Sequence, residues 1–154
     1  MRRIAALLLL VAAPLMSQTA HPDLSGKWSL DAAASGVEAA GVTATVTIAQ
    51  TEKSIKIDQD VKTPAGDNHS SLTFAIDGNP SKNTVDVQGR QIEMNSTTAW
   101  EGSTLVVTTT ADVGVPVKSV ERWSLDETGK KLTLSSDIDA AGQTMSRKQV
   151  FNKS

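Results

Sequence analysis

The stretch TATVTIAQTEKSIKID, residues 43–58, decides the fold class. Its apolar side chains alternate with Thr, Lys and Asp at a period of two residues, and Glu52-Lys53 interrupts the alternation. A period of two places every second side chain on the same face of a β-strand. This stretch therefore predicts a β-hairpin with one apolar face.

The same alternation continues along the chain from Gly26 onward, whereas helical spacing is almost absent. Short turns rich in Gly, Asp and Asn separate the apolar runs. Segment 32–41 predicts a connection of small residues with room for one helical turn. We expect nine or ten antiparallel strands in a meander: besides the hairpin, these are 25–31, 72–76, 85–87, 92–100, 105–111, 117–125, 132–138 and 144–152.

A meander of this length must protect its two edge strands, and the usual solution is to curl until the first and last strands pair. We therefore predict an all-β, up-and-down antiparallel barrel of about 8–10 strands. A two-sheet sandwich stays open as the alternative, because turn spacing does not separate the two. The pattern argues against an outer-membrane barrel, which carries girdles of aromatic residues, since the chain has no Tyr.

The first twenty residues predict a cleavable export signal. Met1-Arg2-Arg3 precedes an unbroken apolar run over 4–13, and small or polar residues follow. The run is shorter than the ~20 residues that a membrane-spanning helix needs. We expect residues 1–20 to be removed and residues 21–154 to form one domain. Because the chain has no Cys, which is common in bacterial envelope proteins, we expect a periplasmic or secreted bacterial location.

Composition limits the partners. The formal net charge is −2, and removal of Arg2 and Arg3 makes it −4, which disfavours nucleic acid and anionic lipid. We expect no insertion into a membrane. The oligomeric state leaves no trace in the sequence.

We find no set of residues for catalysis or metal binding. The two histidines, His21 and His69, lack a second ligand at metal-binding spacing. A nucleophilic serine requires a base and an orienting acid, and no such triad stands out. We therefore expect no enzyme activity, metal or cofactor.

Gly26-Lys27-Trp28, at the start of the first predicted strand, resembles the G-x-W signature of lipocalins and related calycin barrels. The layout of WEGSTLVV at 100–107 and ERWSL at 121–125, with a closing strand that ends in Phe151, resembles fatty-acid-binding proteins and bacterial exported lipocalin-like domains. It differs from fatty-acid-binding proteins in its export signal and in the short segment 32–41, where they have a helical lid.

The resemblance implies structural roles for Gly26 and Trp28. In lipocalins an arginine near the last strand covers the G-x-W tryptophan, and Arg147 is the candidate here. A cation over Trp28 would contribute about 0.5–2 kcal/mol.

Polar residues on otherwise apolar faces of the late strands are the candidate ligand contacts. Glu121 shares a face with Trp123, and Arg147 shares one with Gln149 and Phe151. If both faces point inward, a Glu121–Arg147 ion pair is expected. Gln149 and Phe151 stand where the resemblance would place an Arg-x-Tyr pair. The predicted ligand-binding residues are Glu121, Trp123, Arg147, Gln149 and Trp100.

These residues also have a purely structural interpretation, in which the polar ones lie near a wet end of the barrel and the tryptophans pack in the core or at the rim. The leading hypothesis is an exported, non-catalytic protein of lipocalin type that binds a small apolar or amphipathic molecule. The alternative is a protein-interaction or envelope structural module with a packed barrel and functional loops.

The export signal predicts a defined new N-terminus. Mature protein recovered from the periplasm should begin between Gln18 and His21, as N-terminal sequencing would report. Retention of Met1 in the exported protein would contradict the assignment.

Overall fold

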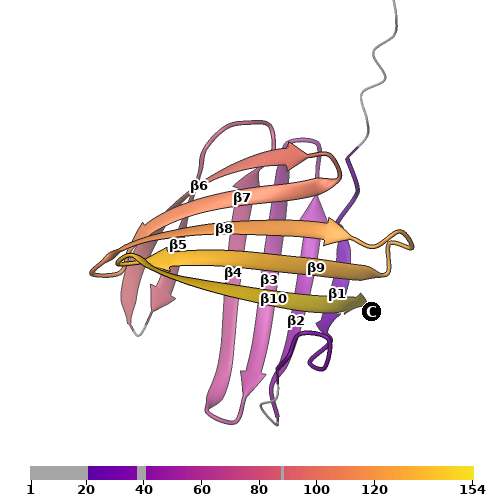
Figure 1. Ribbon diagram of the computed structural model, residues 1–154, viewed down its shortest axis with the longest axis horizontal. Coiled ribbons are helices and arrows are strands. Elements are labelled where there is room, and N and C mark those ends of the chain that lie inside the picture. The colour runs from indigo at the N-terminus through magenta and orange to yellow at the C-terminus, as the bar shows by residue number, and fades with distance from the viewer. Residues whose placement is uncertain (1–20, 38–40, 88) are drawn as a thin grey trace, which may run out of the picture.

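The chain folds as ten antiparallel strands joined in a meander, as the computed structural model describes it for residues 21–37, 41–87 and 89–154 (Figure 1). The predicted export signal, residues 1–20, lies outside the described residues. The strands are β1 Gly26–Leu30, β2 Thr43–Gln50, β3 Ser54–Thr63, β4 Gly66–Ala75, β5 Ser81–Val87, β6 Arg90–Glu101, β7 Thr104–Asp112, β8 Pro116–Leu125, β9 Lys131–Ala140 and β10 Gln143–Lys153.

All ten strands belong to one sheet, in the order β4-β3-β2-β1-β10-β9-β8-β7-β6-β5. β1 pairs with β2 on one side and with β10 on the other, so the first strand of the chain lies beside the last. In Figure 1, β6 to β10 run across β2 to β4, and the sheet folds back on itself. The predicted barrel is confirmed as a nearly closed one, and the sandwich of two separate sheets is not what forms.

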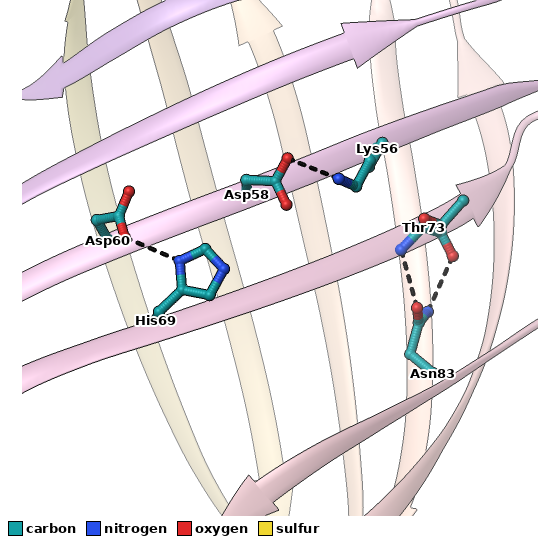
Figure 2. Close-up of polar contacts among 6 residues, drawn as sticks. All are labelled: Lys56, Asp58, Asp60, His69, Thr73 and Asn83. Atoms are coloured by element: carbon teal, nitrogen blue, oxygen red, sulfur yellow. Dashed lines mark hydrogen bonds and ion pairs between the residues drawn. The ribbon is translucent and has the colours of Figure 1, made fainter.

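The barrel is left open between its two edge strands, β4 and β5, and side chains bridge them at one end. The Asn83 amide forms two hydrogen bonds with the backbone of Thr73: it accepts from the N–H at 2.8 Å and donates to the carbonyl at 2.9 Å (Figure 2). The Ser81 hydroxyl accepts from the Ala75 N–H at 2.6 Å, and Thr98 donates to the Ala75 carbonyl at 2.6 Å. These bonds satisfy backbone groups that a neighbouring strand would otherwise pair.

Several strands extend beyond their apolar residues. We expected strands at 54–58 and 72–76, but β3 and β4 each have ten residues and reach into the polar segments 59–63 and 66–71. Backbone pairing between Lys62 and Asp67 continues the hairpin there, although few side chains are buried. An alternating pattern of apolar residues indicates which parts of a strand are buried. It therefore does not predict the part of a strand that is exposed to solvent.

The connection after β1 forms a single turn, in which the Ser35 N–H donates to the Asp31 carbonyl at 3.0 Å. Residues 38–40 of the predicted connection lie outside the described residues. Within the described part of the chain, no helix has the length and apolar character needed to cross a membrane.

One end of the barrel is filled by the apolar core, here named the closed end. Inward side chains from β1 to β4 and from β6 to β10 meet there, and the most fully buried large ones are Trp28, Phe151, Leu24, Ile55, Leu105 and Leu132. Cross-strand register aligns Leu125, Leu132 and Phe151 across β8, β9 and β10. Burial of this set is the main driving force for closing the barrel.

The cation over Trp28 is Lys153, not the predicted Arg147. The Lys153 ammonium lies 5.2 Å from the centre of the Trp28 ring, and the Trp28 indole donates to the Leu24 carbonyl at 3.1 Å. Register explains the difference, because Trp28 is opposite Lys153 on β10. Arg147 lies six residues earlier on β10, about 20 Å away at the rise of a strand.

Gly26 permits this arrangement. Its φ of +142° is strained for any other residue, and an added Cβ would lie 3.0 Å from Lys153 Cε. The G-x-W residues therefore build the closed end of the barrel, where Gly26 admits the lysine that covers Trp28.

The side-chain bridge between β4 and β5 generates a stability prediction. Asn83→Ala removes two hydrogen bonds and leaves the Thr73 backbone unpaired, so we expect a loss of about 1–2 kcal/mol in urea denaturation and faster exchange of the Thr73 amide. The control is Asn95→Ala on the exposed face of β6. Equal stability and equal Thr73 exchange in both variants would show that the bridge does not hold the two edges.

Candidate functional site

An inner chamber of about 100 Å³ lies above the apolar core, inside the barrel. The part of its lining nearer the closed end, named the lower wall, is apolar. The part farther from the closed end, named the upper wall, carries polar groups. The apolar lining residues are Val46, Ile57, Leu72, Phe74, Met94, Trp123, Leu132, Leu134 and Phe151, and the polar ones are Gln59, Thr109, Glu121, Arg147 and Gln149. The chamber therefore suits a molecule with an apolar part and a polar part.

A second, wider hollow of about 460 Å³ adjoins the chamber toward the connection between β1 and β2. We name it the vestibule. Gln59, Arg147 and Gln149 line both spaces and form a polar collar between them. The other vestibule residues are Leu30, Ser35, Gly36, Val37, Val42, Ala44, Val61 and Lys148.

Glu121 is the acidic residue of the chamber wall, and its carboxylate is held in place by its own strand. The Trp123 indole N–H donates to Glu121 Oε2 at 3.2 Å. Burial raises the pKa of Glu121 above its ordinary value, and the Trp123 hydrogen bond and the charge of Arg147 oppose that rise without cancelling it. Ionisation of Glu121 is therefore less favourable in the folded protein than in the unfolded chain.

The expected Glu121–Arg147 ion pair is absent from the described ion pairs. Strand order gives the reason: Ser136 on β9 is opposite both Glu121 on β8 and Arg147 on β10, so the two backbones are about 10 Å apart. Arg147 is exposed and donates instead to Gln149 Oε1 at 3.1 Å. The acid and the base lie on one row of the inner wall without contacting each other.

The structure brings four of the five predicted ligand residues together, since Glu121, Trp123, Arg147 and Gln149 all line the chamber. Their contact with a ligand stays a prediction. Trp100 lies elsewhere: it is half-buried at the closed end of β6 and stacks on His21, with ring centres 4.5 Å apart. It shares the inward face of β6 but is too near the Glu101–Thr104 turn to reach the chamber lining.

Two polar residues of the chamber escaped the sequence analysis. Gln59 lies on the inward face of β3 with Ile55 and Ile57, because it is the next alternate residue. This position in the alternation could have identified it from the sequence. The Thr109 hydroxyl bonds to Ser96 at 2.8 Å, and both residues are buried. The long run of threonines in β7 conceals which of them face inward.

The outer face of β3 and β4 carries charged side chains that pair with neighbours. His69 bonds to Asp60 Oδ1 through Nδ1 at 2.8 Å, and Lys56 contacts Asp58 at 3.0 Å (Figure 2). His69, Asp60 and Lys56 have side chains more than half exposed, and such pairs contribute at most about 1 kcal/mol. In the residues that the structure covers, no three His, Cys, Asp or Glu side chains cluster as a metal site would require.

No protein-family model matches the chain, and no curated protein matches it in sequence. Solved structures do match. Secretory abundant heat soluble protein 4 from Ramazzottius varieornatus aligns with a TM-score of 0.57 and 12% identity, over 90% of this chain and 99% of that one.

Two lipid-binding proteins align in the same way. The zebrafish ileal bile acid-binding protein, complexed with cholic acid, has a TM-score of 0.55 and 16% identity over 84% of this chain and 98% of its own. The fatty-acid-binding protein of Manduca sexta has a TM-score of 0.51 and 13% identity over 84% and 99%. At these identities the likeness concerns the fold, and the predicted calycin-like fold is confirmed.

The partly buried carboxyl of Glu121 generates a pH prediction. The unfolded chain ionises Glu121 near its ordinary pKa of 4.5, and the folded chain ionises it only at higher pH. Stability from Glu121 is thus complete below that value and is lost as pH rises through the folded pKa. Glu121→Gln should therefore be more stable than the original protein at pH 7, by an amount set by the rise in the Glu121 pKa, and the gain should vanish near pH 4.

Urea denaturation at several pH values would measure this difference. The control is Glu93→Gln, whose carboxyl lies on the outer face beside Lys82 and whose pKa is lowered by that contact. It should give no gain at any pH. A Glu121→Gln gain that does not depend on pH would refute the explanation by ionisation.

Proposed function

We propose that the protein binds a small apolar or amphipathic molecule and performs no chemistry on it. The observation that carries this proposal is the inner chamber, with its apolar lower wall, its polar upper wall and the collar residues that it shares with the vestibule. The cholic acid complex of the bile acid-binding protein supports it by analogy of fold.

The lining suggests how such a molecule would lie. Its apolar part would contact Phe74, Leu134 and Phe151, which are buried inward side chains. Its polar group would reach Gln149 and Arg147 at the collar. Trp123 lies in the same wall, so its fluorescence would report occupancy.

Size restricts the ligand class. The chamber of about 100 Å³ is below the ~300 Å³ at which small-molecule pockets usually begin. A long-chain lipid would not fit in it alone. We therefore favour a short apolar group in the chamber, with the rest of any larger molecule in the vestibule of about 460 Å³.

Exposed apolar side chains favour a second candidate, a protein-interaction module. Val87, Val113, Val115 and Met145 are all at least 40% exposed. They lie at or beside the β5–β6, β7–β8 and β9–β10 turns, at the same end of the meander. A partner protein could cover this rim, while the small chamber would then be a packing defect.

The place of action follows from the leader pattern alone. We propose that the domain works outside the cytoplasm of a bacterium, in the periplasm or secreted. A small binding protein there could carry or sequester a molecule of the cell envelope.

A plug in the collar tests the binding function. Gln149→Phe would enlarge a side chain that lines both the chamber and the vestibule, and its control, Ser146→Phe, changes an exposed residue on the opposite face of β10 that lines neither space. Titration with 1-hexanol, followed by tryptophan fluorescence, should give affinity at least about tenfold lower for Gln149→Phe and an unchanged affinity for the control.

Two results would argue against the proposal. Equal binding in both variants would place the ligand outside the chamber. No binding by the original protein, together with no retained mass in native mass spectrometry of protein purified from its own envelope, would favour the interaction module.

A further inference from the structure

The inner chamber has an acid where a site for fatty carboxylates would need a base. Glu121 lies in its wall, and the one basic residue of the described lining, Arg147, is exposed at the collar. Water screens the charge of an exposed guanidinium far more than that of a buried carboxylate. When Glu121 is ionised, the charge least screened from a molecule inside the chamber is therefore negative.

Nothing in the described chain neutralises Glu121 by direct contact. Its hydrogen bond comes from the neutral indole of Trp123, at 3.2 Å. Ser136 separates it from Arg147 across β9, and Arg147 is already bonded to Gln149. A partly buried carboxylate of this kind is satisfied best by a cation or by further hydrogen-bond donors.

We infer that the inner chamber selects a ligand whose polar group is a hydrogen-bond donor, best a primary ammonium on a short alkyl group, and disfavours carboxylates. The inference rests on the proposed binding function and names its ligand class. The alkyl group would lie against Phe74, Leu134 and Phe151, and the ammonium would bond to Glu121. A carboxylate in the same position would face Glu121 as a like charge, which costs free energy in a site of low dielectric.

Three probes of equal length separate the possibilities: hexylamine, 1-hexanol and hexanoate, each titrated into the mature protein at pH 7. We expect hexylamine to bind at least about tenfold more tightly than hexanoate, because only the ammonium can donate a hydrogen bond to the charged Glu121 carboxylate. Glu121→Gln should remove most of that preference, and it should change the affinity for 1-hexanol much less than the affinity for hexylamine, because glutamine still accepts a hydrogen bond. Glu93→Gln, with the same chemical change on the outer face, should behave as the original protein.

A pH series on the original protein gives the same information without a variant. Arg147, the other ionisable side chain of the described chamber lining, keeps its charge over this range, and so does hexylamine. In a series from about pH 4 to about pH 8, affinity for hexylamine should rise as Glu121 ionises, and affinity for 1-hexanol should change much less, because the hydroxyl carries no charge.

The outcomes distinguish this inference from the proposed function. Tighter binding of hexanoate, or an amine preference that survives Glu121→Gln, would overturn the inference and leave the binding function standing. Failure of all three probes to bind would overturn both.

Discussion

The pairing of β1 with β10 is the constraint on which the rest of the molecule depends. Three residue pairs, from Trp28 with Lys153 to Leu30 with Phe151, join the beginning of the domain to its end. Without them, β1 and β10 would each have an unpaired edge, and strands β1 to β4 would not be joined to strands β5 to β10 in one sheet. Because this pairing has long sequence separation, it becomes favourable only when the apolar core forms at the same time.

The same register distributes polarity along the barrel axis. On β10, inward positions change from Phe151 through Gln149 to Arg147, and on β8 they change from Leu125 through Trp123 to Glu121. Core packing is thus confined to the closed end, and groups that require partners or water are displaced toward the collar. The candidate site lies where this change occurs, so the position of the site follows from the fold and its chemistry from a few inward residues.

Much of this was predictable from the sequence, for a physical reason. Alternation indicates which face of a strand is buried, and it predicted the hairpin of residues 43–58, the meander and the residues that share a strand face with Glu121 and with Arg147. It could not predict the polar half of β4, because side chains exposed to solvent on both faces of a strand show no alternation of apolar and polar residues. Nor could it distinguish Lys153 from Arg147 over Trp28, because that choice depends on the register of β1 against a strand more than a hundred residues away.

Glu121 is an ionisable residue at a position where the fold favours a neutral side chain. A glutamine there would keep an acceptor for the Trp123 indole without the penalty of burying an ionisable group. Positions that violate a rule of stability without full compensation in the fold are where function is to be sought. Gly26, Trp28 and Phe151 each satisfy the barrel itself, and barrels of 12–16% identity share its overall shape. The shape of the barrel therefore indicates little about the ligand. The Glu121 carboxyl, which the barrel does not require for stability, indicates more.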